Sequence, residues 1–292
     1  MSQDLQRQDL QRQDLQRQDL QRQDLQRYLD IATEAALAAG AELQHYWCNL
    51  KDIQEKRPGD LVTEADRAAE KVVLEVLKRH VPDHAILAEE SGMRGEWTDE
   101  FLWAIDPLDG TTNYAHQYPC FAVSIGLLIK GVPAVGVVYN PIHNELYRAA
   151  KGLGATCNRL PIRVSKVDAL VNSLLVTGFA YDRHSRADNN YAEFCHLTHK
   201  THGVRRDGAA SLDLAYVACG RLEGYWERGL SPWDLAAGVV ILEEAGGQVT
   251  AYDQSAFDLR SGRILATNGR VHAELSQELL SIHPLSEFSG ES

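Results

Sequence analysis

Acidic side chains occur in three short segments, each at the junction of an apolar run with a turn or a helix. These are "LAEESG" at the end of the apolar run 85–88, "DPLDGT" after residues 101–105, and "PWD" before a helix expected from residue 235. Hard divalent cations such as Mg²⁺ take oxygen ligands, and two nearby ions need bridging carboxylates from several segments. Each acid taken alone is an ordinary turn or capping residue. Together they form a candidate cation site of Glu89, Asp106, Asp109 and Asp234.

The segment "DPLDGTTN", residues 106–113, has a composition that suits both a turn and a site. Pro107 fixes its own φ and restricts Asp106, which orients one carboxylate and leaves the Leu108 carbonyl free to turn inward. Gly110 lets the backbone approach a ligand closely. A helix that begins at Thr111 would point unpaired N–H groups at an anion. On these residues alone, a solvated corner and a paired cation–phosphate site both remain open.

The overall composition limits the class of protein. The chain has 292 residues, 44% of them apolar, and a formal charge of −12. The acidic balance argues against a nucleic-acid or anionic-membrane binder, because phosphate groups demand clustered Lys and Arg. Five scattered cysteines without a CxxC pair, and no signal-like N-terminus, indicate a reduced, cytoplasmic protein. No stretch reaches the roughly 18 to 20 apolar residues of a membrane helix, so we expect no membrane association.

The N-terminal segment is of low complexity. Residues 3–27 are five copies of Gln-Asp-Leu-Gln-Arg. A step of five residues turns a helix by about 140°, so the leucines cannot form one apolar stripe. We expect residues 1–27 to be a disordered or transiently helical tail, with a partner-binding arm as the functional alternative.

The elements that must position the acidic residues begin at residue 28. Apolar spacing predicts a first helix there, and a second helix follows Thr63 as N-cap, with Asp66 in the capping-box position. Short β-rich runs between 121 and 166 predict an antiparallel sheet, and the second half alternates between the two types of element. We expect a single domain over residues 28–288, with an N-terminal α+β lobe (28–165) and a C-terminal α/β lobe (166–288).

Four motifs resemble those of the inositol monophosphatase family of magnesium-dependent, lithium-inhibited phosphatases. They are "DLVTEAD" (60–66), "AEES" (88–91), "WAIDPLDGTTN" (103–113) and "PWDLAAG" (232–238), and the resemblance runs from residue 28 to about 280. It implies a layered αβαβα sandwich of the inositol-monophosphatase/fructose-bisphosphatase type, between α+β and α/β in class. It also implies a homodimer and two to three Mg²⁺ ions per site.

The resemblance assigns roles to the metal-binding positions. Glu89, Asp106 and the Leu108 carbonyl would hold one ion, and Asp106, Asp109 and Asp234 a second. A third ion would share Glu89.

The resemblance also assigns catalytic and substrate-binding positions. Thr111, near Asp66, would with Glu89 position and deprotonate a water. Residues that would contact the substrate are Asp109, Gly110, Thr111, Ala210 and Glu227. Lys56 falls near a loop lysine of the family, although the segment from it to Asp60 is one residue shorter than in animal enzymes.

The implied reaction is hydrolysis of a phosphate monoester by in-line attack of water, without a phosphoenzyme. The chain has no P-loop, no Rossmann glycine pattern and no G-x-S-x-G elbow. Because "DGTTN" is similar to inositol monophosphatases, we expect inositol 1-phosphate, a small phosphorylated polyol, as substrate. Fructose 1,6-bisphosphate, histidinol phosphate and 3′-phosphoadenosine phosphate are the alternatives within the superfamily.

Two further alternatives stay open. Arg205 and Arg206 could bind a second phosphate of the substrate, or pair with Asp207 or Asp213. From a different class, the chain could be a regulatory, protein-binding member of the fold, because fold alone does not prove activity.

Overall fold

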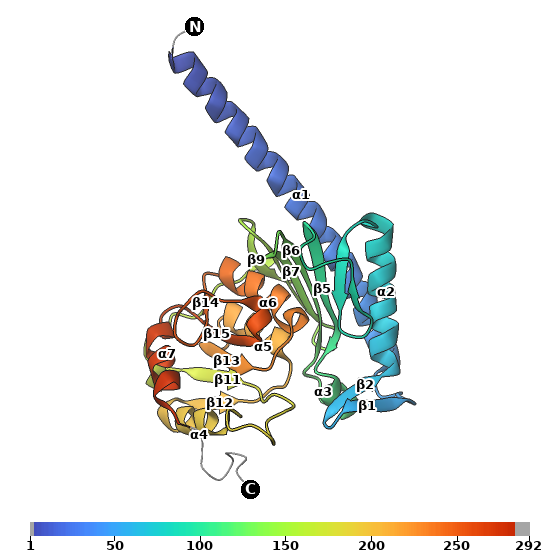
Figure 1. The fold of residues 1–292 in the computed structure, drawn as a ribbon, viewed down its shortest axis with the longest axis vertical. Helices are drawn as coiled ribbons and strands as arrows, with labels where there is room; N and C mark the ends of the chain where they lie inside the picture. The colour runs from blue at the N-terminus through green and yellow to red at the C-terminus, as the bar shows by residue number, and fades with distance from the viewer. Residues whose placement is uncertain (1–2, 284–292) are drawn as a thin grey trace.

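The computed structural model describes the backbone of residues 3–283 and the side chains of residues 22–283. Two large sheets, of eight and five strands, alternate with three layers of helices, which confirms the layered αβαβα sandwich (Figure 1). The expected end of the domain at residue 288 lies outside the described residues.

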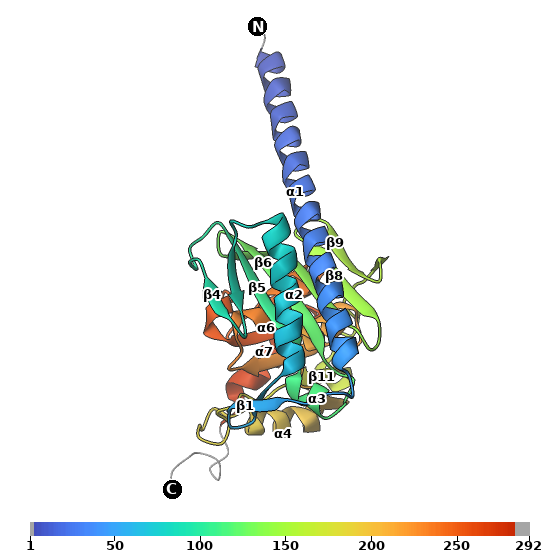
Figure 2. The ribbon, with the colours of Figure 1, turned by 90° about the vertical axis from the view of Figure 1, so that its right-hand side faces the viewer.

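The first helical layer consists of α1 (Gln3–Tyr46) and α2 (Glu64–His80), which lie side by side against the large sheet (Figure 2). Thr63 caps α2 in a capping box with Asp66, as the sequence predicts. A hairpin of β1 (Ile53–Arg57) and β2 (Asp60–Thr63) joins the two helices. Their alanine-rich and leucine-rich faces bury against the sheet and form one of the two main apolar cores.

The large sheet has eight strands in the order β10-β9-β8-β7-β6-β5-β3-β4. All its neighbouring strands pair antiparallel except β3 and β5, so the antiparallel sheet predicted between residues 121 and 166 is confirmed. Its strands are β3 (Ala85–Ala88), β4 (Gly92–Arg94), β5 (Phe101–Asp109), β6 (Ala122–Ile129), β7 (Val132–Asn140), β8 (Glu145–Ala150), β9 (Gly154–Cys157) and β10 (Leu160–Pro161).

The central helices α5 (Ala210–Ala218) and α6 (Pro232–Glu244) lie between the two sheets. Gly136 of β7 explains how closely α6 can approach, because a Cβ at that position would overlap the Ala237 carbonyl. The helix therefore rests directly on the sheet backbone, and its first turn is held next to the end of β5.

The second sheet has five strands in the order β12-β11-β13-β15-β14 and is covered on its outer face by two helices. Its strands are β11 (Leu174–Thr177), β12 (Gly203–Arg205), β13 (Gly224–Arg228), β14 (Gln248–Thr250) and β15 (Arg263–Thr267); the outer helices are α4 (Tyr191–Lys200) and α7 (His272–Ser281). Shorter helices are α3 (Thr111–Ala115), η1 (Leu170–Asn172) and η2 (Leu259–Ser261). The lobe boundary expected at residues 165/166 falls between β10 and η1.

The repeat segment is helical and continuous with α1, and it projects from the body of the molecule (Figures 1 and 2). Residues 3–39 contain neither glycine nor proline, so nothing in the sequence stops the helix at residue 28. Leu25 already packs against the first core, upstream of the expected boundary. Over residues 3–283, no helix is long and apolar enough to cross a membrane.

Candidate active site

The site is built around the C-terminal end of β5. Every residue of β5 after Phe101 is buried, up to Asp109, and the chain then turns at Gly110 into α3. Gly110 has a φ of 95°, and a Cβ there would lie 3.0 Å from the Cys120 carbonyl oxygen. Only glycine fits this corner without strain. The predicted helix from Thr111 is confirmed.

Two β5 carboxylates are fixed by hydrogen bonds from the backbone. Asp106 Oδ1 accepts a bond from the Leu108 amide at 2.9 Å, and the side chain is almost fully buried. Asp109 accepts bonds from the Ala210 amide (3.2 Å), the Ser211 amide (2.7 Å) and the Ser211 hydroxyl (2.5 Å). Asp109 therefore ties the end of β5 to the first turn of α5.

Asp234 reaches the same region from α6. Its Oδ2 accepts a hydrogen bond from the Ser231 amide at 2.7 Å in a capping box. The helix begins at Pro232 with Ser231 as N-cap, and not at residue 235, because Pro is well suited to the first helical position. Asp234 is thus a first-turn residue of α6, aimed at the end of β5.

Glu89 follows β3 and is paired with a cation of the β1–β2 hairpin. Lys56 Nζ lies 2.9 Å from Glu89 Oε1 and 2.6 Å from Glu90 Oε1. Burial alone would lower the pKa of Lys56, but Glu89 and Glu90 together raise it above its usual value. The Lys56 ammonium therefore stays charged and holds the hairpin over Glu89.

The four acids predicted as ligands act on one another electrostatically, which places them together. Burial, and then the charges of Glu89, Asp109 and Asp234, raise the pKa of Asp106 well above its usual value. Burial and the same mutual repulsion raise the pKa of Asp234. Burial raises the pKa of Asp109 to about 6, although bonds from Ser211 act in the opposite direction.

This donor set fits a divalent cation in its chemistry. Within residues 22–283, no three His, Cys, Asp or Glu side chains already stand in a metal-ligand arrangement. However, buried carboxylates that repel one another are relieved by a positive charge placed among them, and carboxylates are the ligands that Mg²⁺ prefers. The residues that would hold such ions are Glu89, Asp106, Asp109, Asp234 and the buried Leu108 carbonyl.

Thr111 and Asp66 meet at the edge of this cluster. The Thr111 hydroxyl lies 2.9 Å from Asp66 Oδ1 and 2.9 Å from the Leu108 carbonyl oxygen. Asp66 Oδ2 accepts bonds from the Thr63 amide (2.7 Å) and hydroxyl (2.6 Å). Burial raises the pKa of Asp66 to about 7 in spite of these bonds. The capping box of α2 therefore also orients a hydroxyl of the candidate site.

Glu227 and Ala210 lie on the side of the C-terminal sheet. Burial raises the pKa of Glu227 to about 7, against a hydrogen bond from the Tyr225 hydroxyl at 2.7 Å and the charge of Arg206. The Ala210 amide binds Asp109, which connects this side to the carboxylate cluster. Burial raises the pKa of Asp207, and the charges of Arg205 and Arg206 act in the opposite direction.

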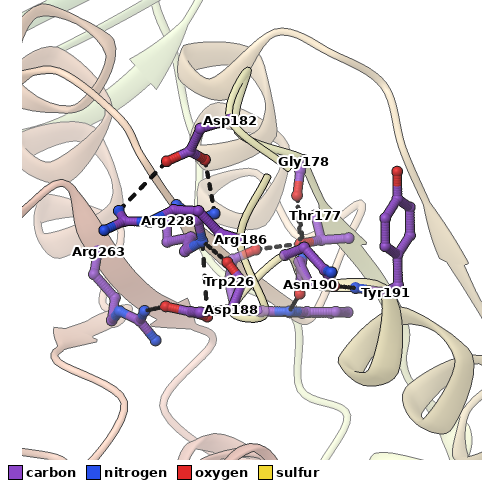
Figure 3. A network of polar contacts seen from close by, with 11 residues as sticks. Thr177, Gly178, Asp182, Arg186, Asp188, Asn190, Tyr191, Trp226, Arg228 and Arg263 are labelled. Carbon is purple, nitrogen blue, oxygen red and sulfur yellow. Dashed lines mark hydrogen bonds and ion pairs between the residues drawn. The ribbon is translucent and has the colours of Figure 1, made fainter. Parts of the chain in front are cut away.

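Sequence reasoning missed a network that shapes this side of the site, shown in Figure 3. Asn190 Nδ2 donates to Thr177 Oγ1 and to the Gly178 carbonyl, both at 2.7 Å, and Trp226 Nε1 donates to Asn190 Oδ1 at 2.7 Å. The buried Arg228 pairs with Asp182 at 2.7 Å. These contacts fix both ends of the connection 178–190. Ser211, whose hydroxyl and amide hold Asp109, was also missed, and its only sequence signal is its place beside Ala210 in "DGAAS".

Comparison with known proteins gives consistent matches over most of the chain. The model of the inositol monophosphatase family matches residues 24–284. An inositol-1-monophosphatase of Synechocystis sp. is 66% identical over 253 residues, which is 86% of this chain and 88% of that protein. The Nus factor SuhB of Pseudomonas aeruginosa is 44% identical over 264 residues, 88% of this chain and 96% of that protein. A solved inositol monophosphatase from Anabaena (Nostoc) sp. superposes with a TM-score of 0.84 at 64% identity, covering 90% of this chain and 99% of that one.

Proposed function

This chain belongs to the inositol monophosphatase family, and on that premise we propose that it hydrolyses inositol 1-phosphate with Mg²⁺ as cofactor. The observation that carries the proposal is the convergence of four carboxylates from three segments, namely Glu89, Asp106, Asp109 and Asp234, at the end of β5. Asp106 and Asp109 are buried and Asp234 and Glu89 are half-buried, so their mutual repulsion is only weakly screened by water.

The metal-binding residues in this proposal are Glu89, Asp106, Asp109, Asp234 and the Leu108 carbonyl, for two to three Mg²⁺ ions. Such ions would place positive charge near the phosphate and lower the pKa of a nearby water. The three aspartates are fixed by the Leu108, Ser211 and Ser231 amides, so the donor oxygens are held in place before any ligand arrives. Gly110 brings the backbone close to the position of the phosphate.

The chain's own proton-handling groups lie at the Thr111 edge of the cluster. The Thr111 hydroxyl donates a hydrogen bond to Asp66 Oδ1 at 2.9 Å. Its oxygen therefore keeps lone pairs that can accept a hydrogen bond from a water. We assign to this pair the orientation of the attacking water, and to Glu89 the acceptance of its proton. Glu227, Ala210 and Asp109 face the opposite side, where the leaving alcohol would lie.

A second candidate function is favoured by the 44% identity to a protein named Nus factor SuhB. In that alternative the chain would act mainly by binding other proteins. The carboxylate cluster and the Thr111–Asp66 pair favour hydrolysis, because protein binding has no need of mutually repelling buried acids. A homodimer and lithium sensitivity are further parts of the proposal, carried by the family resemblance, and a cytoplasmic location is a further part that rests on the scattered cysteines.

The test is phosphate release from inositol 1-phosphate, fructose 1,6-bisphosphate, histidinol phosphate and 3′-phosphoadenosine 5′-phosphate. Each ester is assayed with Mg²⁺, with EDTA, and with Mg²⁺ plus Li⁺. We expect Mg²⁺-dependent and Li⁺-inhibited turnover that is fastest on inositol 1-phosphate. Absence of Mg²⁺-dependent turnover on all four esters would overturn the enzymatic proposal. Faster turnover of another ester would make that ester the substrate in place of inositol 1-phosphate.

A further inference from the structure

Tyr181 and Arg57 form a contact that joins the two halves of the molecule. Tyr181 lies in the connection 178–190 between β11 and α4, and Arg57 ends β1. The guanidinium carbon of Arg57 is 4.8 Å from the centroid of the Tyr181 ring, and its Nε lies 2.8 Å from Asp60 Oδ2. A guanidinium over an aromatic face is an attractive arrangement. The β1–β2 hairpin and the C-terminal connection therefore meet at this ring.

The Tyr181 ring stands at the candidate active site. Burial and the charges of Asp60, Glu89, Asp234 and Asp106 act on its hydroxyl, and three of these four acids are candidate metal ligands. The residue nevertheless remains 41% exposed. The ring thus lies between the carboxylate cluster and the solvent.

The same connection borders Glu227. Gly178, three residues before Tyr181, lies so close to the Glu227 carboxylate that a Cβ at Gly178 would overlap it. In the proposed function, Glu227 faces the leaving alcohol. The connection that carries Tyr181 therefore borders the alcohol side of the site, and the Arg57 hairpin contacts the Tyr181 ring.

The connection is anchored on both sides of Tyr181. Asp182 is bound by Arg228 at 2.7 Å, and Asp188 is bound by Arg228 and Arg263 (Figure 3). Asn190 closes the far end through its bonds to Thr177 and Gly178. Because the neighbouring residue is held by a buried arginine, the position of the ring is defined before a substrate enters.

We propose that Tyr181 is a specificity-determining residue, whose ring, supported by Arg57, forms the wall against which the alcohol part of the phosphate monoester packs. This rests on the proposed phosphatase function. A cyclic polyol presents C–H groups that can pack against an aromatic ring, whereas a short open-chain alcohol makes little such contact. The wall therefore favours esters of bulky, ring-shaped alcohols over esters of small ones.

The experiment compares KM and kcat for inositol 1-phosphate and for glycerol 2-phosphate at saturating Mg²⁺. For Tyr181→Ala we expect KM for inositol 1-phosphate to rise about tenfold while kcat stays within about threefold. KM and kcat for glycerol 2-phosphate should each change by less than about twofold. Tyr181→Phe keeps the ring and should stay close to wild type. Arg57→Ala removes the support of the ring, so its KM for inositol 1-phosphate should lie between those of Tyr181→Phe and Tyr181→Ala.

The matched control is Arg260→Ala, which removes a similar arginine–aromatic contact, since Arg260 lies 5.3 Å from the centroid of the Trp97 ring. It should leave KM and kcat for both esters unchanged. If Tyr181→Ala lowered kcat/KM equally for both esters, or left both unchanged, the specificity role would be wrong although the enzyme is active. If wild type released phosphate from neither ester, the proposed function itself would fail, and the inference with it.

Discussion

The Thr111 hydroxyl lies 2.9 Å from Asp66 Oδ1, and this contact links the first turn of α3 to the capping box of α2, 45 residues earlier. One carboxylate thereby serves two tasks. Its Oδ2 completes the helix cap with Thr63, and its Oδ1 orients a hydroxyl toward the carboxylate cluster. The stability of α2 and the geometry of the candidate site are therefore coupled through Asp66.

Replacement of Thr111 by valine should lower kcat by roughly 100-fold or more, because the isostere removes the hydroxyl that orients the water. Thr111→Ser keeps the hydroxyl and should retain most of the activity. The measurement is steady-state phosphate release from inositol 1-phosphate at saturating Mg²⁺. Thr112→Val is the matched control, since its side chain is exposed on the same short helix. Equal activity of Thr111→Val and wild type would remove Thr111 from the mechanism.

Asp106→Asn should lower kcat by about 1,000-fold or more. The Tm of the metal-free variant should equal or slightly exceed that of metal-free wild type. The amide oxygen can still accept the bond from the Leu108 amide, and the lost charge is one that Glu89, Asp109 and Asp234 repel. Phosphate release and thermal melts in EDTA and in Mg²⁺ measure both effects. We expect Mg²⁺ to raise the Tm of wild type but not of the variant.

The surface substitution Asp168→Asn controls for the loss of one negative charge, because Asp168 is exposed. It should leave turnover and the Mg²⁺-induced rise in Tm intact. If Asp106→Asn turned over normally, or if Mg²⁺ stabilised it as much as wild type, the assignment of Asp106 as a metal ligand would be wrong.

Glu227 should make the stability of the metal-free protein depend on pH. Burial raises its folded pKa to about 7 from an ordinary value of 4.5. The folded state therefore binds the proton more tightly than the unfolded state. This contribution to stability is fully present below the unfolded pKa, and it is lost as pH rises through about 7. Relative to Glu227→Gln, wild type should lose about 3 kcal/mol between about pH 4.5 and about pH 8.

Urea unfolding of both proteins in EDTA, at about pH 5 and about pH 8, measures this difference. Comparison with the variant cancels the titration of the other carboxylates. Glu75→Gln, at an exposed position of α2, should show no such change relative to wild type. A difference between wild type and Glu227→Gln that is the same at both pH values would show that burial does not raise the pKa of Glu227.

Local features of the site could be predicted from the sequence, because each depends on neighbouring residues. The capping box of Thr63 and Asp66, the turn at Gly110 and the helix from Thr111 all follow from short motifs. Contacts between distant segments could not be predicted in this way. Ser211 binds Asp109 across 102 residues, and no local pattern records that the first turn of α5 faces the end of β5.

The same limit applies to Tyr181 and to the start of α1. Tyr181 meets Arg57 because the fold brings the β1–β2 hairpin and the connection 178–190, which are far apart in the sequence, into contact. In α1, the five-residue spacing of leucines correctly indicates that no single apolar stripe exists, but it does not indicate where the helix begins. Residues 28–46 dock on the sheet and provide a formed helix onto which the upstream turns can add at low cost.

Removal of residues 2–21 should leave kcat, KM and Tm close to those of wild type. This part of α1 projects from the body in both views and precedes the contacts of Leu25 and Arg27 (Figures 1 and 2).

Removal of residues 2–27 goes further, because it also deletes Leu25, which packs against the core, and Arg27, which donates to the His80 carbonyl. It should lower the free energy of unfolding by about 1 to 2 kcal/mol, and therefore lower Tm by a few degrees, while kcat stays unchanged. Thermal melts and phosphate release of the two truncations, with Leu25→Ala in the full chain as the matched control, separate packing from catalysis. A loss of turnover in the shorter truncation would mean that the repeat segment acts on the site.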